Sequence, residues 1–299
     1  MAVASNLEVS VDAPRAVGGG WLKSSRRAAR RNPVGALAGL FCLGLVILAI
    51  VGPQLSPHSA NDISFERLTA PSLDHPFGVD HLSRDLLSRI IVGARNSLGI
   101  AFTAIAVSTI LGISLGVTSG FWGSGLDLGV SRLIDVMLSY PPLVFVIFMV
   151  AIFGRDFWTI AIAIGLILTP GATRIVRSAT ISVRGLQYIE AARSLGATDV
   201  RIMFRHVLPN VAAPTIVIAS VNIGLAILIE AAVSFLGQGV SSPTNPSWGR
   251  MLQETRQYWQ TSWWTMIFPG AAITFAVLAF NIFGDALRDW LDPRLRGSR

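Results

Sequence analysis

The sequence predicts an all-α, polytopic membrane protein with six transmembrane helices. Apolar residues make up 52% of the 299 residues, charged residues make up 14%, and the mean hydropathy is +0.58. These values are typical of chains that face lipid rather than of soluble domains built around one core. The apolar residues also occur in blocks of about 18 or more, the length that a helix needs to cross the hydrocarbon of a bilayer.

Six apolar segments predict the spans. The first, Val34–Gly52, follows a basic cluster that ends at Arg31, so we expect an uncleaved anchor; a cleaved secretory signal is the alternative. The later spans are predicted at Ser97–Phe121, Leu128–Phe153, Phe157–Thr173, Val211–Leu236 and Trp264–Leu287. Pro141–Pro142 and Pro170–Gly171 are expected to kink or break the third and fourth spans.

The basic residues predict the orientation, because cytoplasmic loops carry the excess of lysine and arginine. The segments expected inside hold 17 of the 24 basic side chains, and those expected outside hold seven. Both termini are therefore expected in the cytoplasm of a multi-pass protein of the inner or plasma membrane. An even number of spans also requires the two termini to share a side.

Composition excludes several classes of site. Lys23 is the only lysine, so a phosphate-binding loop with its lysine, a Schiff-base lysine and a lysine-rich nucleic-acid surface are all excluded. Cys42 is the only cysteine, which excludes a disulfide framework and a thiolate metal cluster. We expect no catalytic residues, no metal, no bound cofactor and no nucleic-acid partner.

The connection between Arg174 and Asn210 predicts a helical hairpin that turns at Gly196. Thr198 can cap its second helix, and Pro209 is expected to end that helix. One apolar stripe is expected on it, at i, i+3, i+4 and i+7, made of Val200, Met203, Phe204 and Val207. Such a stripe needs a partner surface. On the opposite side, Pro53–Asn96 and Gln238–Ser262 are predicted as loops longer than a simple turn requires.

The hairpin carries a resemblance to a known family. Glu190-Ala191-Ala192, then Gly196, then Leu208-Pro209, resemble the E-A-A…G…L-P loop of permease subunits in ABC importers. Further segments resemble the second, C-type permease of the dipeptide/oligopeptide branch: His75–Asp80, Ser234–Gly237, Pro246–Gly249 and Leu278–Asn281. Ser83 and Gln238 depart from the usual residues of that branch.

The resemblance implies a type I ABC importer permease fold and a permease that forms half of a pathway for peptides. It implies four kinds of partner: a homologous second permease, two cytoplasmic ABC ATPase subunits or domains that bind ATP and Mg²⁺, an extracytoplasmic solute-binding protein, and membrane lipid. Nickel, haem, glutathione or another small solute remains the alternative cargo. The implied organisation is a cytoplasmic tail (1–33), a first span with an outer loop (34–96), a permease domain (97–288) with its coupling loop (174–210), and a cytoplasmic tail (289–299).

Polar residues in the fifth predicted span and just after it are candidates for the translocation pathway. These are Glu230 and Asn222 in the span and Gln238 at the start of the following loop, because intramembrane polar groups are costly unless they face water or a partner. The alternative for Glu230 is a structural hydrogen bond to Ser234, and Asn222 is favoured as a bond between helices. Arg132 and Asp135, three residues apart, are expected to pair locally.

Small-residue repeats predict close helix contacts, at Gly35 and Gly39 and again at Gly112, Gly116 and Gly120. Two other functions are weighed. Gly112–Gly116 matches the G-x-S-x-G pattern of hydrolases, but its serine is mid-span and every histidine is in a loop. An ion-coupled carrier is disfavoured because the predicted spans lack charge near the membrane midplane.

Overall fold

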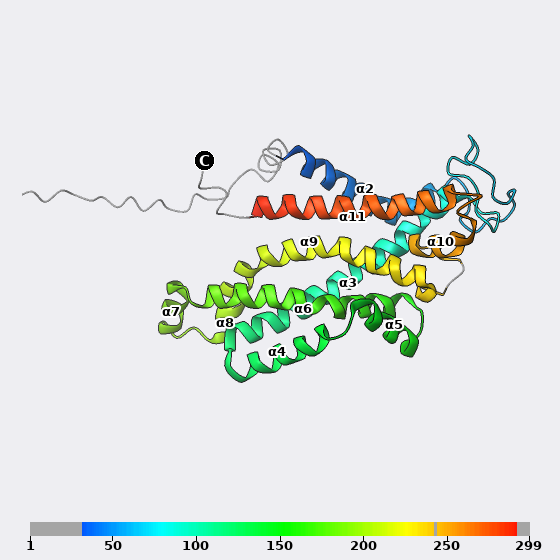
Figure 1. Ribbon diagram of the computed structural model, residues 1–299. Coiled ribbons are helices and arrows are strands. Elements are labelled where there is room, and N and C mark those ends of the chain that lie inside the picture. Colours follow the sequence, from blue (N-terminus) through cyan, green and yellow to red (C-terminus); the bar gives the residue numbers. More distant parts are fainter. Residues whose placement is uncertain (1–31, 242–243, 292–299) are drawn as a thin grey trace, which may run out of the picture.

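The computed structural model describes residues 32–241 and 244–291, and long helices dominate these ranges. Five helices run side by side along most of the molecule (Figure 1): α2 (Pro33–Leu55), α3 (Leu86–Trp122), α6 (Phe157–Arg184), α9 (Leu208–Val233) and α11 (Trp264–Leu291). The described residues contain no β-strand, only one isolated antiparallel bridge between Val79 and Asp85. The predicted all-α class is confirmed.

The third predicted span is broken in two. The helices α4 (Ser124–Leu138) and α5 (Pro142–Phe153) are bent by 88° relative to each other at Pro141–Pro142. Proline lacks the backbone N–H that a continuing helix needs, so the predicted break is confirmed. Five helices of the described chain are long and apolar enough to span a membrane, and the bent pair makes six if it counts as one span.

The fourth predicted span differs from expectation because α6 passes through Pro170 without a break. Hydroxyl groups on this helix bond back to its own backbone, with Thr169 Oγ1 donating to Gly165 O and Thr173 Oγ1 donating to Thr169 O, both at 2.8 Å. Tight packing against α3 supports the same stretch from outside. Proline is tolerated in a spanning helix where neighbouring groups compensate in this way.

Glycines on α3 bring α3 and α6 into close contact. A Cβ placed on Gly112 would lie 2.7 Å from Ala172 Cβ, and one on Gly116 would lie 2.8 Å from Val176 Cβ. A Cβ on Gly120 would lie 2.8 Å from Thr180 Cβ. Each successive glycine therefore meets the next turn of α6. The predicted close contact is confirmed, since only glycine leaves room for these backbones to approach.

Glycines also bring the first and last helices of the described chain into close contact. A Cβ on Gly35 of α2 would clash with Ala286 Cβ of α11, and one on Gly39 would lie 3.0 Å from the Phe283 ring. Figure 1 shows α2 and α11 side by side on one flank of the bundle. The first helix is therefore packed on the last one rather than isolated.

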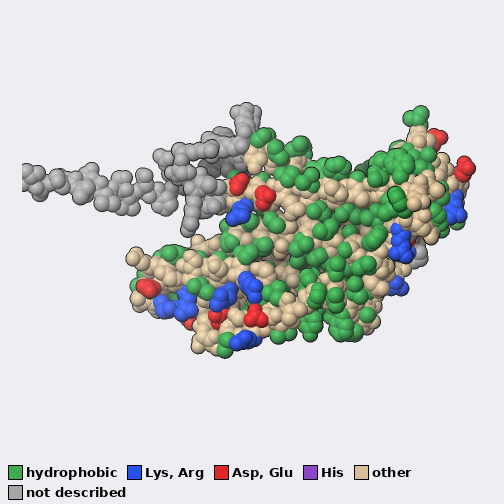
Figure 2. All heavy atoms as spheres, in the orientation of Figure 1, with side chains coloured by type: hydrophobic (Ala, Val, Ile, Leu, Met, Phe, Trp, Pro, Cys, Tyr) green, Lys and Arg blue, Asp and Glu red, His purple; other side chains and the backbone are tan. Residues whose placement is uncertain are grey.

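The two ends of the bundle differ. We name one the hairpin end, made of α7 (Gln187–Ser194) and α8 (Asp199–Ile202), and the other the loop end, made of residues 56–85 and the segment around α10 (Trp248–Thr255). Figure 1 places them at opposite ends of the long helices, and Figure 2 shows apolar side chains across the middle with charged ones gathered toward both ends.

Short irregular helices complete the described chain. They are the π-helices η1 (Met203–Val207) and η2 (Ser234–Gln238) and the 3₁₀-helix η3 (Arg256–Tyr258). Helix α3 begins at Leu86, eleven residues before the predicted span at Ser97, because Asp85 caps it by accepting from Ser88 N at 2.8 Å. Hydropathy could not detect these extra residues, about three helical turns, since their polar side chains bond to the loop end.

Candidate functional site

The hairpin is anchored to the bundle by a small apolar cluster. Ile189 of α7, Ile202 of α8 and Val207 of η1 are fully buried, and they pack with Phe121 and Val176 of the long helices α3 and α6. Asn210 Nδ2 adds a polar tie by donating to His206 O at 2.6 Å and to Tyr188 OH at 3.2 Å. The hairpin is therefore held against the bundle at several points and can transmit a force applied to its tip.

The tip of the hairpin is a capped turn. Gly196 has a φ of +81°, the left-handed region that favours glycine. Backbone bonds close the turn, with Leu195 N donating to Ala191 O and Ala197 N donating to Ala192 O, both at 3.1 Å. Thr198 then caps α8 by accepting from Arg201 N at 3.4 Å, as predicted.

The second arm of the hairpin differs from the predicted single stripe. Met203 and Val207 are buried, but Val200 and Phe204 are 57% and 66% exposed. The π-helix η1 adds a residue to the turn at this point, so positions spaced for an α-helix do not share a face. The correction leaves Val200 and Phe204 on the surface, where they are free to meet a partner.

Pro209 also differs from expectation, since it does not end the helix. It lies in the first turn of α9, directly after η1, so that α8, η1 and α9 follow one another without a gap. A proline in the first turn lacks only an N–H that has no partner there. The hairpin is therefore continuous with the long helix α9.

Four of the six predicted coupling residues lie on this hairpin, and Leu208 and Pro209 lie at the start of α9. Glu190, Ala191, Gly196 and Pro209 are exposed, whereas Ala192 and Leu208 are half-buried. Leu195 at the tip is 88% exposed, an unusual position for a leucine. Within the described residues Glu190 makes no ion pair, so its carboxylate is available to a partner.

Two ion pairs brace α4 against α6 near the hairpin end. Arg177 donates to both carboxylate oxygens of Asp127, with Nε to Oδ1 at 2.5 Å and Nη2 to Oδ2 at 2.6 Å. Asp135 pairs with Arg174 at 3.1 Å, so the predicted local pair with Arg132 is wrong. Asp135 pairs with Arg174 instead because α6 lies directly alongside α4. This contact joins segments that are far apart in the sequence, so helical spacing does not indicate it.

The intramembrane candidates do not form one site. Glu230 is 1% exposed and accepts from Ser234 Oγ at 2.8 Å, beside Ser97 and Ser247. Asn222 is half-buried and lies eight residues earlier, about 12 Å along the helix. Gln238 is half-buried at the end of η2. Its chain neighbours Gly237 and Gly239 line a hollow together with Arg155, Arg250 and Gln253, but Gln238 itself is not among the lining residues.

The loop end is an ordered unit that the sequence did not reveal. Trp248 is fully buried, with Nε1 donating to Ile90 O at 3.0 Å and its backbone N donating to Ser97 Oγ at 3.1 Å. A Cβ on Gly249 would lie 2.6 Å from the backbone of Ala231, so α10 sits directly on α9. The two long loops predicted as separate segments are thus packed on each other and on the ends of α3 and α9.

Buried charges connect the two loops. Arg84 binds Asp80 at 2.7 Å and Glu254 at 2.9 Å, and Arg89, 1% exposed, lies 3.3 Å from Glu254. Burial alone would raise the pKa of Glu254, but the guanidinium groups of Arg89, Arg250 and Arg84 outweigh it and hold that pKa below its ordinary value. Charge spacing in the sequence gives no sign of this network, because its members lie about 170 residues apart.

Comparison with known proteins shows which family this chain belongs to. Residues 108–297 match the model of the family described as "Binding-protein-dependent transport system inner membrane component". The chain belongs to this family. It is a multi-pass permease subunit of an ABC importer and not the subunit that hydrolyses ATP.

Several relatives of this permease have descriptive names. It is 40% identical over 268 residues to the dipeptide transport system permease protein DppC of Alkalihalophilus pseudofirmus, which covers 89% of this chain and 88% of the relative. It is 39% identical over 278 residues to the glutathione transport system permease protein GsiD of Pectobacterium atrosepticum, covering 92% of each. A chain of the MetNI methionine ABC transporter has a similar fold, with a TM-score of 0.56 at 19% identity over 68% of this chain and 96% of that one.

Proposed function

We propose that this permease imports short peptides and forms half of their pathway, together with a second, homologous permease. The observation that carries the proposal is the similarity to the dipeptide permease DppC along nine-tenths of both chains. The DppC of Pseudomonas aeruginosa, described as a di/tripeptide permease, is also 40% identical over 272 residues. Import of glutathione is the second candidate, and it is favoured by the similarity to GsiD.

The hairpin end is proposed to lie in the cytoplasm and to receive the ATPase. Glu190, Ala191 and Gly196 are exposed there, and Leu195 and Phe204 offer apolar surface beside them. Ala192, Leu208 and Pro209 complete the proposed coupling surface at its base. ATP and Mg²⁺ then belong to the two ATPase subunits or domains, and this chain binds no cofactor of its own.

The loop end is proposed to face the outside and to receive the solute-binding protein. The excess of basic residues favours this orientation, since the segments expected in the cytoplasm from the sequence, which include the hairpin, hold 17 of the 24. Both termini then lie in the cytoplasm, with the boundaries 1–33, 34–96, 97–288 and 289–299 expected from the sequence. Apolar side chains exposed on α5, such as Phe148 and Ile152, face lipid or the second permease.

The three proposed pathway residues are not equally well supported: Glu230, Asn222 and Gln238. Gln238 is the strongest, because its two chain neighbours, Gly237 and Gly239, line the polar hollow at the end of η2. Glu230 is the weakest, because its hydrogen bond to Ser234 and its burial favour the structural alternative. Asn222 lies part-way along α9 and is only half-buried.

Uptake of labelled peptide tests the proposal. Cells that lack their own dipeptide importers would express this permease with its second permease, ATPases and binding protein. We expect ATP-dependent uptake of a labelled dipeptide that excess unlabelled di- and tripeptides compete away. Competition by glutathione but not by dipeptides would favour the second candidate, and uptake that persists without the ATPases would contradict the proposal.

A further inference from the structure

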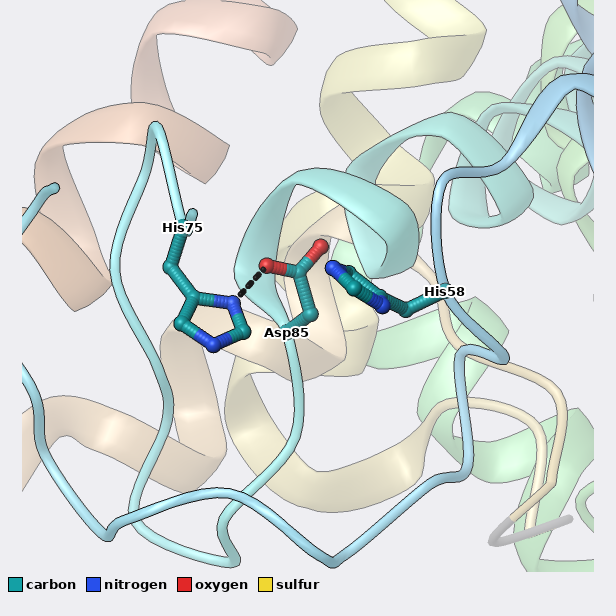
Figure 3. A group of neighbouring side chains, drawn as sticks. All are labelled: His58, His75 and Asp85. Atoms are coloured by element: carbon teal, nitrogen blue, oxygen red, sulfur yellow. Dashed lines mark hydrogen bonds and ion pairs between the residues drawn. The ribbon is translucent and has the colours of Figure 1, made fainter. Parts of the chain in front are cut away.

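Three side chains with metal-binding atoms meet at the loop end. His58 comes from the segment after α2, His75 from the following loop, and Asp85 from the N-cap of α3 (Figure 3). Each offers one ligand atom, and these atoms all lie within 4.8 Å of one another. The closest pair, His75 Nδ1 and Asp85 Oδ1, is 2.9 Å apart.

The backbone around the cluster fixes the direction of each side chain. Asp85 Oδ2 accepts from Ser88 N at 2.8 Å, which leaves Oδ1 to face His75. The backbone N of His58 donates to Ser88 Oγ at 3.1 Å, so the same turn of α3 also positions His58. Figure 3 shows the two imidazole rings on either side of the carboxylate.

An aromatic ring supports both histidines. Phe65 lies edge-on to His58 with the ring centroids 5.0 Å apart, and edge-on to His75 with the centroids 4.5 Å apart. The centroids of the two imidazole rings are themselves 5.3 Å apart. The rings are therefore held near each other by packing, which lowers the entropy cost of bringing them to one ion.

The hydrogen bond between His75 and Asp85 accounts for the placement of these two side chains but not for that of His58. Within the described residues the ring of His58 makes no hydrogen bond, yet it is held beside a buried carboxylate. Two imidazoles and one carboxylate form a donor set typical of zinc and other divalent transition metals, whereas Ca²⁺ and Mg²⁺ prefer oxygen ligands.

We propose that His58, His75 and Asp85 form a binding site for a divalent transition-metal ion of the zinc type. Neighbouring ligand atoms of tetrahedral zinc lie about 3.3 Å apart. The widest separations in the cluster, at most 4.8 Å, must therefore shorten by up to roughly 1.5 Å, and the 2.9 Å between His75 Nδ1 and Asp85 Oδ1 must lengthen slightly. A fourth position remains for water or an incoming ligand. A bound ion would pin the segment after α2 to the start of α3 and so order the loop end.

Cobalt(II) and zinc(II) are the probes that test the site. The full chain, purified within its importer complex with a tag that lacks histidine, would be titrated with Co²⁺ while its visible absorption is recorded. We expect a tetrahedral cobalt spectrum that saturates at one ion per chain and is displaced by Zn²⁺. His58→Ala and Asp85→Asn should each weaken Zn²⁺ binding by about tenfold or more.

Matched variants separate a built site from a hydrogen-bonded pair. Asp85→Asn keeps an oxygen that can cap α3, so loss of binding in this variant is not caused by loss of the helix start. His81→Ala and His206→Ala change the other two histidines of the chain and should leave Zn²⁺ affinity within about twofold of the original. Absence of a tetrahedral spectrum, or equal affinity in all four variants, would overturn the proposal.

Discussion

Arg84 and Glu254 join the two long loops of this permease across 170 residues of sequence. The guanidinium Nη2 of Arg84 lies 2.9 Å from Glu254 Oε2, and both side chains are largely buried. Asp80 on one side and Arg89 on the other extend the pair into a network. The loop end is therefore a folded unit with its own buried charges rather than a pair of connections.

Acid should weaken this unit through Glu254. Its pKa is lowered on folding, so its contribution to stability is present above the ordinary glutamate pKa and is lost as the pH falls through the lowered value. We expect the melting temperature of the purified complex to fall progressively below about pH 5. Thermal unfolding monitored by tryptophan fluorescence between pH 7 and pH 3 measures this fall in melting temperature.

Removing the carboxylate separates this effect from general acid denaturation. Glu254→Gln should cost about 1–3 kcal/mol at pH 7, because it leaves Arg84 and Arg89 with less compensation, and it should flatten the acid limb. Glu66→Gln removes an exposed carboxylate from the same end. It should change neither the stability at pH 7 nor the loss of stability in acid. Identical pH profiles in the original protein and Glu254→Gln would contradict this account.

Close packing of α3 on α6 predicts a large effect from a single methyl group. A Cβ on Gly116 would lie 2.8 Å from Val176 Cβ and 2.9 Å from Thr173 O, which is backbone and cannot move aside easily. We expect Gly116→Ala to destabilise the protein by about 1–3 kcal/mol. Gly129→Ala, where nothing lies within 4 Å, is the control and should be neutral or slightly stabilising. Equal melting temperatures for the two variants would exclude the proposed contact.

Local features of the fold could be predicted from sequence, and contacts between distant segments could not. The apolar blocks, the break at Pro141–Pro142, the turn at Gly196 and the glycine contacts follow from short-range patterns and are found in the structure. The early start of α3 at Leu86 was missed because its polar residues bond to α10, far along the chain.

In the candidate site, too, local features could be predicted from the sequence and contacts between distant segments could not. The turn and cap of the hairpin were predicted correctly, but η1 split the expected apolar stripe and joined α8 to α9. A π-helix has no clear sequence signal, since it arises from a single added residue. The cluster of His58, His75 and Asp85 was equally hidden, because the loop that brings them together is set by tertiary packing.

The turn at Gly196 predicts a loss of coupling without a loss of folding. A β-branched residue at a φ of +81° costs on the order of 1–3 kcal/mol in local strain, and nothing lies within 4 Å to add a clash. Gly196→Val should therefore leave the permease in the membrane but lower ATP-driven uptake at least tenfold. Membrane content by immunoblot and uptake of labelled dipeptide measure the two effects.

Gly125 provides the matched control for that change. It lies on α4 at the same end of the bundle, with open space around its Cβ position and no left-handed backbone. Gly125→Val should keep normal uptake. Normal uptake in Gly196→Val as well would show that the shape of the hairpin tip has no part in coupling.

Glu230 is expected to behave as a structural group. Its burial and its bond from Ser234 predict that Glu230→Gln changes uptake by less than about twofold, because an amide oxygen still accepts that bond. Glu230→Leu should lower the amount of assembled complex, since it leaves the Ser234 hydroxyl without this partner. A loss in Glu230→Gln that is confined to peptides with a free amino group would instead establish substrate recognition.

Cross-linking from the two ends tests the central claim most directly. Leu195, 88% exposed at the hairpin end, and Leu73, fully exposed at the loop end, would each be changed to cysteine in a chain whose native Cys42 is replaced by serine. We expect a thiol-to-amine cross-linker to capture an ATPase subunit from Leu195→Cys and the solute-binding protein from Leu73→Cys. Capture of the ATPase from Leu73→Cys, or of the binding protein from Leu195→Cys, would contradict the proposed coupling surface and its orientation.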